Sequence, residues 1–301
     1  MRFKKLLFIV ISLLIITAIF YYLNYFTWNP KITVPFESGQ PTNTDFIDLS
    51  SFNPFYLQKG LELDFIPDSN PRIIKTAVIP HHLLPFFIHA DFFKRLQLQK
   101  PTNVILIGPN HPNMGDYSVI TTTSNFKSMY GQSNTDPGLV KSLITEIKWA
   151  GEDTQVLSKE HSVTELIPYF HFYLPNTTIT PFILKPGITE ENLDKFYEQI
   201  SINIKENTVV VFSIDFSHYL DSYQAREHDS QTLKALQNND YSTVLSMGNN
   251  NVDSPESLGL FLNFTKGAFN DSCEIMQNTN SGEIVKEPFK STTSYFYILC
   301  Y

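Results

Sequence analysis

Cysteine is scarce in this sequence. Only two of its 301 residues are cysteines, Cys273 and Cys300, and both lie near the end. No Cys-x-x-Cys pair occurs, so the usual signatures of a cysteine zinc site and of a thioredoxin-like redox motif are absent. The two cysteines could pair in an oxidising compartment, but buried free thiols agree equally well with the sequence.

Nucleotide and nucleic-acid signatures are also missing. The sequence contains no Gly-x-Gly-x-x-Gly fingerprint and no phosphate-binding loop. Its formal net charge is −8 at pH 7, and its pI is about 5.5. No basic patch lies beyond the first five residues, which argues against nucleic acid as a partner.

One long apolar run lies close to the N-terminus. A basic segment, residues 1–5, precedes residues 6–23 (LLFIVISLLIITAIFYYL). As a helix, about 18 residues span roughly 27 Å, close to the hydrocarbon thickness of a bilayer. Aromatic residues at its far end and the lack of a small-residue cleavage pattern favour an uncleaved signal anchor over a cleaved signal peptide. We therefore expect a single-pass membrane protein with residues 1–5 in the cytoplasm and the C-terminal part outside it.

The rest of the chain divides by composition. Residues 24–70 are rich in Pro, Asn, Thr, Ser and Asp, which is typical of a stalk or of an N-terminal extension wrapped on a domain. Residues 71–301 are long enough for a single core, and strand-like runs alternate with helical ones there. This alternation predicts one α/β domain, with a central and mostly parallel sheet flanked by helices.

The expected elements of this domain follow from its periodicity. The predicted strands are Ile73–Ile79, Val104–Ile107, Tyr117–Thr122, Thr178–Leu184, Thr208–Ile214 and Ser294–Leu299. The predicted helices are Leu84–Gln97, Pro137–Trp149, Val163–Leu174, Glu190–Ile204, Tyr223–Asn238, Tyr241–Met247 and Ser257–Thr265.

Histidine is rare, with eight residues in 301, yet three histidines follow predicted strands directly. His81 and His111 come after the first two strands, and His218 follows the strand that ends before Asp215. In an open α/β sheet, ligands bind beyond the carboxyl ends of the strands. A single histidine at a strand end is more often a hydrogen-bonded loop residue, but three of them indicate a polar site. The other histidines outside Glu160-His161 are expected to be structural or at the surface: His82, His89, His171 and His228.

Two imidazoles and one carboxylate can bind one face of a divalent metal ion and leave positions open. Such a set serves iron(II) in oxygen chemistry and can also hold zinc with a bound water. The candidate ligands are His81, His111 and Asp253, which comes just before a predicted helix.

Acid–base groups are expected beside this metal set. His161 and His218 are candidates, because a histidine near neutral pKa can take and return a proton. Asp215 and Glu160 are expected to fix a ring tautomer, and Ser162 is a candidate N-cap of the helix that follows.

These motifs resemble the Memo family, which includes proteins called AmmeMemoRadiSam system protein B. The resemblance covers residues 72–301 and rests on four motifs in order. They are Pro80-His81, the run Ile107-Gly-Pro-Asn-His111, the run Glu160-His-Ser-Val163, and the run Ser213-Ile-Asp-Phe-Ser-His-Tyr219. The family is similar in fold to class III extradiol ring-cleaving dioxygenases, so the resemblance implies that architecture.

The resemblance also implies site residues. His81 and His111 match the family's two histidine ligands, and His218 matches the acid–base histidine of the dioxygenases. The third family ligand is commonly a cysteine, and Asp253 falls at its position here, with Glu256 as the alternative. A carboxylate in place of a thiolate makes iron(II) the expected metal, with zinc or copper as alternatives.

The sequence therefore predicts a membrane-anchored, metal-dependent oxidoreductase of the dioxygenase type that acts on a small molecule. The main alternative is a non-catalytic binding or scaffold protein that keeps the same fold and cleft. A third hypothesis is an enzyme that carries out hydrolysis at a bound zinc ion. The sequence does not identify a protein partner.

Overall fold

The computed structural model describes residues 45–66, 68, 71–265 and 269–301, all within the second of the chain's two units, 38–301. The expected membrane anchor at residues 6–23 lies outside the described residues. Among the residues that are described, no helix has both the length and the apolar character needed to cross a bilayer.

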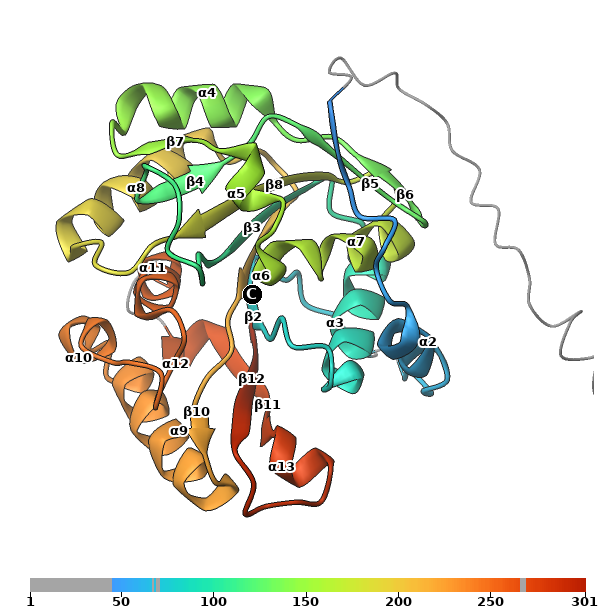
Figure 1. The fold of residues 1–301 in the computed structure, drawn as a ribbon, viewed down its shortest axis with the longest axis vertical. Helices are drawn as coiled ribbons and strands as arrows, with labels where there is room; N and C mark the ends of the chain where they lie inside the picture. The colour runs from blue at the N-terminus through green and yellow to red at the C-terminus, as the bar shows by residue number, and fades with distance from the viewer. Residues whose placement is uncertain (1–44, 67, 69–70, 266–268) are drawn as a thin grey trace, which may run out of the picture. The chain divides into compact units, whose positions relative to one another are not determined.

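A nine-stranded sheet forms the centre of the described part, and Figure 1 shows its strands. In sheet order its members are β10 (His218–Leu220), β12 (Thr292–Cys300), β2 (Thr76–Ile79), β9 (Thr208–Ser213), β3 (Asn103–Pro109), β8 (Thr178–Leu184), β4 (Val119–Thr121) and β7 (Ala150–Glu152), with β11 (Cys273–Asn280) on β12.

The sheet is mixed rather than mostly parallel. Its four central strands, β2, β9, β3 and β8, are parallel neighbours. The flanking strands β12 and β4 run antiparallel to β2 and β8, and β11 and β10 run antiparallel to β12. β11 and β12 are consecutive strands joined only through α13 (Ser281–Ile284), and so short a connection allows antiparallel pairing. Hydrophobic runs indicate burial but carry no information about strand direction.

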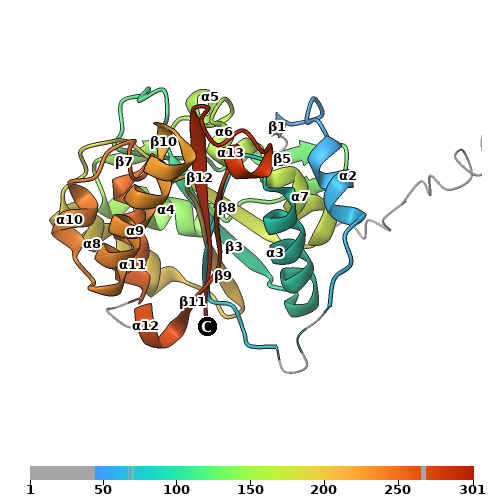
Figure 2. The ribbon, with the colours of Figure 1, turned by 90° about the horizontal axis from the view of Figure 1, so that it is seen from below.

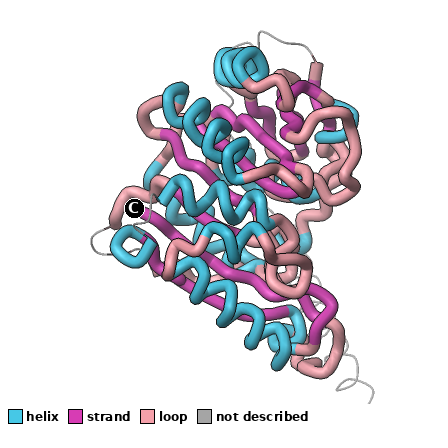
Figure 3. The backbone as a smooth tube through the Cα atoms, turned by 90° about the vertical axis from the view of Figure 1, so that its left-hand side faces the viewer, coloured by secondary structure: helices cyan, strands magenta, loops and turns pink. Residues whose placement is uncertain are grey.

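Helices cover both faces of this sheet (Figure 2). One face carries α2 (Phe55–Leu61), α3 (Phe86–Gln99) and α7 (Ile167–Tyr173). The other carries α4 (Pro137–Glu146), α8 (Glu190–Asn203), α9 (Ser222–Gln237), α10 (Tyr241–Leu245), α11 (Pro255–Thr265) and α12 (Phe269–Ser272). Figure 3 shows helices lying over the strands on the side that it turns to the viewer. Two short helices, α5 (Thr154–Leu157) and α6 (His161–Thr164), precede α7.

The two helical layers explain why the central strands are apolar throughout. Successive side chains of a strand point to opposite faces, so alternate residues enter different cores. In β3, Ile105 and Ile107 join one buried cluster, and Val104 and Leu106 join the other. The sequence of a strand that is buried on both faces is therefore a continuous hydrophobic run.

Most of the predicted strands and helices are present, but one predicted helix is divided into two. The predicted helix Val163–Leu174 is two helices, α6 and α7. Pro168 stands in the first turn of α7, where its missing N–H costs least. Proline cannot supply the hydrogen bond that a continuous helix would need at this point.

A small second sheet joins distant parts of the chain. Its order is β1 (Phe46–Asp48), β5 (Asn125–Ser128) and β6 (Gly131–Ser133), with β1 parallel to β5. The nearby α2 packs against α3, and Leu57 is almost fully buried. The described residues between 46 and 61 thus pack against the domain.

Cys273 and Cys300 form a disulfide. They face each other in the β11–β12 pair, in a register that a linear sequence does not display. The strand pairing decides between the paired and free thiols that the sequence left open.

His171 ties α7 to the small sheet. Its Nδ1 lies 2.8 Å from Ser128 Oγ, and its Nε2 lies 2.9 Å from Ser133 Oγ. Burial of the ring lowers the pKa of His171 to about 4. The folded protein therefore holds a neutral imidazole at a pH where an exposed histidine would be charged.

This burial predicts an acid-sensitive contribution to stability. Below about pH 6.5 the unfolded chain binds a proton at His171 that the folded chain does not, so stability falls as the pH drops toward 4. Between pH 7 and pH 5, wild-type protein should lose about 2 kcal/mol more unfolding free energy than His171→Gln. Urea denaturation at both pH values measures this, with His228→Gln as the matched control. Equal losses in wild type and His171→Gln would contradict the prediction.

Candidate metal centre

Three neighbouring parallel strands end at the same edge of the sheet. Ile79 of β2 lies beside Ser213 of β9, and Phe212 of β9 lies beside Ile107 of β3. The residues that follow these strands therefore emerge together. They include His81 and His111, which the sequence predicted at strand ends, and Asp215. The third predicted histidine, His218, is the first residue of β10.

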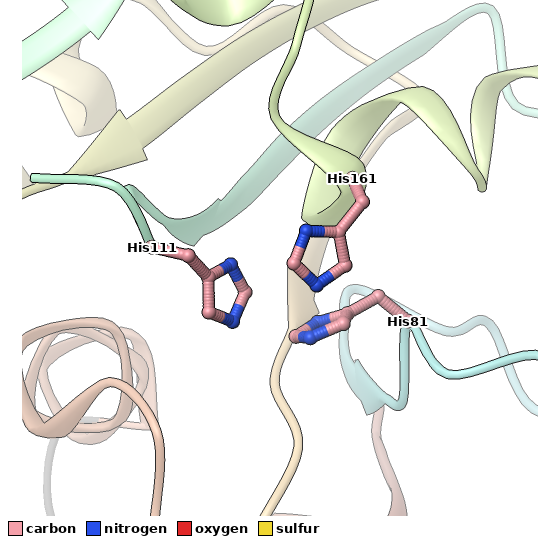
Figure 4. Close-up of side chains that lie close together, drawn as sticks. All are labelled: His81, His111 and His161. Carbon is pink, nitrogen blue, oxygen red and sulfur yellow. The ribbon is translucent and has the colours of Figure 1, made fainter. Parts of the chain in front are cut away.

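A cluster of three histidines lies at this edge, and Figure 4 shows their rings turned toward one another. Each ring of His81, His111 and His161 offers one nitrogen, and these nitrogens all lie within 4.8 Å of one another. The rings of His111 and His161 stack with centroids 4.2 Å apart, and His81 meets both edge-on. The His81 side chain is buried at 2% exposure, whereas that of His161 is 53% exposed.

Asp253 approaches two of these rings. Its Oδ2 lies 3.4 Å from His81 Nε2 and 3.5 Å from His111 Nε2. Two ligands on a tetrahedral ion with bonds of about 2.1 Å are about 3.4 Å apart. The other oxygen, Asp253 Oδ1, is buried and has no hydrogen-bond partner among the described residues. A buried carboxylate oxygen without a partner is costly unless a further group binds there.

The backbone fixes the position of Asp253. Its N–H donates to the Asp215 carbonyl at 3.1 Å, and the Asp215 N–H donates to Asp253 Oδ2 at 3.2 Å. The adjacent residues Phe216 and Val252 form an antiparallel bridge. The segment before α11 is therefore paired with the segment after β9, which brings residues 38 positions apart into one site.

Glu160 orients His111. Its Oε1 accepts from His111 Nδ1 at 2.7 Å, and its Oε2 accepts from the His111 N–H at 2.9 Å. When the ring is neutral, donation from Nδ1 leaves the lone pair on Nε2, directed at Asp253 and the cluster. Glu160 also caps α6, because its side chain accepts from the Ser162 N–H at 3.0 Å. The sequence had suggested Ser162 as the cap, but that residue lies inside the helix.

Ser213 orients the ring of His81, as Glu160 orients the ring of His111. The Ser213 hydroxyl donates to the Ser162 carbonyl at 2.5 Å, so it can accept from His81 Nδ1, 3.3 Å away. This leaves His81 Nε2 unprotonated and directed at the cluster. Sequence reasoning missed Ser213, although it follows the apolar run of β9 directly and is the first polar residue there.

Three further residues that the sequence predicted for the site are Asp215, His218 and Glu256, and each has different contacts. Asp215 Oδ1 accepts from the main-chain N–H of His81 at 3.2 Å, and its Oδ2 lies 3.5 Å from His81 Nε2. His218 is mostly buried, and its Nδ1 has no hydrogen-bond partner in the described part of the chain. Glu256, the alternative ligand, accepts from the Gly187 N–H at 2.6 Å, and no contact joins it to the histidine cluster in the described structure.

Burial and charge separate the pKa values of the histidines. Burial lowers the pKa of His81 to about 4, which keeps its ring neutral. Burial also acts to lower the pKa of His111, but hydrogen bonds with Asp253 and Glu160 outweigh it and raise the pKa to about 10. Burial lowers the pKa of His161, and the neighbouring His111 charge lowers it further.

The carboxyl groups shift in opposite directions. Burial raises the pKa of Asp253 to about 7, and the nearby Asp215 carboxylate adds to the shift. Burial would raise the pKa of Glu160 too, but its hydrogen bonds with His111 and Ser162 hold the pKa below its ordinary value. The site thus contains one firmly ionised carboxylate and one whose charge depends on its neighbours.

Gly108 allows α6 to approach β3. A Cβ added to this glycine would lie 2.7 Å from Ser162 Oγ and 2.9 Å from Ser162 Cβ. Real Cβ atoms essentially never come so close, so a larger residue would push α6 away from the strand. Because α6 carries His161 and its cap Glu160, the cluster depends on this contact.

Comparisons with known proteins agree on one family. A family model described as "Memo-like protein" matches residues 53–298. A MEMO1 family protein of Sulfolobus acidocaldarius is 25% identical over 210 residues, which cover 63% of this chain and 73% of the relative. A MEMO1 family protein of Caldivirga maquilingensis is 24% identical over 177 residues, covering 57% and 62% respectively.

One solved structure has a similar fold. The crystal structure of an uncharacterized protein from Escherichia coli K12 superposes with a TM-score of 0.51. The match covers 74% of this chain and 99% of that chain, with 11% sequence identity. At that identity the similarity concerns the fold alone.

Gly108→Ala should destabilise the protein by about 1–3 kcal/mol, because the added methyl group overpacks the contact with Ser162. Gly248→Ala is the matched control, since a Cβ there meets nothing within 4 Å. Chemical denaturation of both variants measures the difference. Two variants with equal stability would show that α6 does not need the close approach at Gly108.

Proposed function

The chain belongs to the Memo-like protein family, and from that premise we propose that His81, His111 and Asp253 hold a divalent metal ion at which a small molecule binds. The observation that carries the proposal is that His81 Nε2 and His111 Nε2 both lie within 3.5 Å of Asp253 Oδ2, at the cluster in which nitrogens of His81, His111 and His161 lie within 4.8 Å of one another. Each histidine has a hydrogen-bond partner that frees the converging nitrogen, as metal-binding histidines usually do.

The donor set fits such an ion. Two neutral imidazole nitrogens and a carboxylate oxygen suit iron(II) or zinc, and the unpartnered Asp253 Oδ1 provides a second oxygen. Iron(II) held by this set would supply open positions for dioxygen and for the substrate, and iron is therefore the metal that we propose, with zinc or copper as alternatives.

The surrounding residues support an oxidoreductase of the extradiol-dioxygenase type. Burial lowers the pKa of His218, so its ring is neutral near pH 7 and able to accept a proton from a substrate hydroxyl at the unpartnered Nδ1. We assign His161, half of whose side chain is exposed, the role of a donor to the bound substrate. Glu160 and Asp215 position His111 and His81 through the hydrogen bonds described above.

A second function is a binding or scaffold protein that keeps the fold without turnover. The observation in its favour is Asp253 itself, which replaces the cysteine that is common in the family. The two functions differ in whether the chain takes up metal, so one experiment separates them.

Metal uptake tests the proposal directly. Protein purified without oxygen and reconstituted with iron(II), zinc or copper should hold close to one ion per chain. His111→Ala should bind the same ion at least tenfold more weakly, because it removes one of three ligands. His228→Ala is the control, since His228 pairs with Asn251 outside the cluster. Metal absent from wild type, or retained equally by His111→Ala, would contradict the metal site and favour the binding protein.

We also propose that residues 6–23 anchor the chain in a membrane, with the domain outside the cytoplasm. Those residues lie outside the described part, and their support is the apolar run itself. The disulfide between Cys273 and Cys300 adds support, because such bonds persist mainly in oxidising compartments.

Two measurements on cells that express the chain test this placement. The protein should stay with membranes after a carbonate wash, and a maleimide should label Cys273 and Cys300 only after reduction. Cys300→Ser is the control that leaves Cys273 free to react without reduction. The proposed localisation would be contradicted if the carbonate wash removed the protein from membranes and the maleimide labelled the wild-type cysteines without reduction.

A further inference from the structure

A pocket lies outside the histidine cluster, where α9 and α10 meet. Its volume is about 540 Å³, within the range of about 300–1,000 Å³ that small-molecule sites commonly have. Figure 1 shows α10 beside α9, and residues 246–251, which follow α10, complete the wall. None of the residues assigned to the metal centre lines this pocket, so it is a separate site.

The wall of the pocket is polar but carries no formal charge. Four carboxamide side chains line it, those of Gln231, Asn249, Asn250 and Asn251, whereas no Lys, Arg, Asp or Glu does among the described residues. Without a cation the pocket lacks the usual partner of a phosphate or carboxylate group. It also lacks the Phe, Tyr or Trp ring on which a nucleobase commonly stacks. These features favour a neutral ligand that forms many hydrogen bonds.

Three of the four carboxamides are available to such a ligand. The side chains of Gln231, Asn249 and Asn250 are exposed and form no hydrogen bond within the described part of the chain. Each carboxamide offers two N–H donors and one carbonyl acceptor. A hydroxyl group both donates and accepts, so a ligand with several hydroxyl groups can use both kinds of atom at once.

The fourth carboxamide makes the wall rigid. Asn251 Nδ2 donates to the His228 carbonyl at 3.1 Å and to the Thr232 hydroxyl at 3.2 Å. Its Oδ1 accepts from His228 Nδ1 at 3.3 Å. In the neutral imidazole this leaves Nε2 as an acceptor, and Nε2 forms no hydrogen bond to the described residues. His228 thus adds a fixed acceptor to the pocket.

The turn that carries Asn249 and Asn250 is also held in place. The Gly248 carbonyl accepts from the N–H groups of Asn251 at 2.7 Å and Val252 at 3.0 Å. The Asn249 carbonyl accepts from the His218 N–H at 2.7 Å, which ties the turn to the start of β10. A preformed turn lowers the entropy cost of binding a ligand.

We infer that the pocket between α9 and α10 binds a neutral oligosaccharide through the carboxamides of Gln231, Asn249 and Asn250. Met247 supplies an apolar surface for the C–H groups of a sugar ring, and the Thr232 hydroxyl lies 3.8 Å from its Sδ. This inference adds a second ligand site to the chain and does not depend on the metal centre.

Titration with neutral trisaccharides tests the inference. Full-length, metal-free protein is titrated with chitotriose, whose acetamido groups can pair with carboxamides, with maltotriose, and with inorganic phosphate, by saturation-transfer NMR. At least one trisaccharide should bind and phosphate should not. Gln231→Ala and Asn250→Ala should each bind the sugar about fivefold more weakly, because each removes hydrogen bonds. Asn238→Ala is the matched control, since Asn238 is exposed on the same side of α10 in sequence but does not line the pocket.

Gly248 provides a steric test that leaves the polar groups intact. A Cβ added at Gly248 meets nothing within 4 Å, so larger side chains fit there without disturbing the fold. Gly248→Leu should reduce the volume of the pocket and weaken sugar binding at least tenfold, whereas Gly248→Ala should bind within about twofold of wild type. Thermal unfolding with an unchanged midpoint would show that both variants remain folded.

Each result either supports or overturns the inference. It is overturned if wild type binds neither trisaccharide, if phosphate alone binds, or if the Gln231, Asn250 and Gly248→Leu variants bind the sugar as wild type does. Retention on insoluble chitin would identify a polysaccharide chain as the source of the sugar, and binding of soluble chitotriose alone would identify a free oligosaccharide. Because the protein carries no metal in these titrations, failure of the metal site would leave the result unchanged.

Discussion

The candidate site depends most on the buried carboxylate of Glu160. It is fully buried and accepts hydrogen bonds from the N–H and ring of His111 and from the N–H of Ser162. These bonds tie the loop after β3 to the start of α6, so one side chain joins two of the elements that carry the clustered histidines. Charge-assisted bonds of this kind are stronger than neutral ones, and loss of either partner would leave a buried polar group unpaired. The close approach of α6 to β3 at Gly108 makes this geometry sterically feasible.

The sheet supplies the rest of the geometry. β2, β9 and β3 are parallel neighbours, and each is apolar on both faces because helices cover both. Their polar residues on the carboxyl side therefore appear only at or beyond the strand ends, where His81, Ser213, Asp215 and His111 lie together. The same two-sided burial that stabilises the centre of the sheet thus concentrates ionisable groups at one edge. Concentration at a single edge places residues that are far apart in sequence where one ligand could contact them all.

Sequence reasoning identified the parts of this arrangement that local patterns encode. The runs before His81, His111 and Asp215 predicted buried strands, and the chemistry of strand ends predicted a polar site. Strand direction could not be read, because β12 is antiparallel to β2 only as a result of how the chain returns through α13. Ser213 was missed as the partner of His81, and the pairing of Cys273 with Cys300 stayed open, because both depend on contacts between distant segments. Asp253 was chosen as a carboxylate just before a predicted helix and then matched to the third ligand of the family, since no local pattern relates it to the residues that follow β2 and β3.

The charges around Asp253 favour a positive charge at the site. Backbone pairing holds Asp215 and Asp253 together, and both carboxylates face His81, whose burial keeps it neutral. Like charges in a buried environment are unfavourable unless a positive charge lies between them. His111 can supply that charge as a proton, since its carboxylate neighbours raise its pKa to about 10. A metal ion would bind the same Nε2 and must displace this proton. Metal affinity should therefore rise with pH, because metal ligands must be deprotonated to bind, and the proton and the metal are alternative occupants of one site.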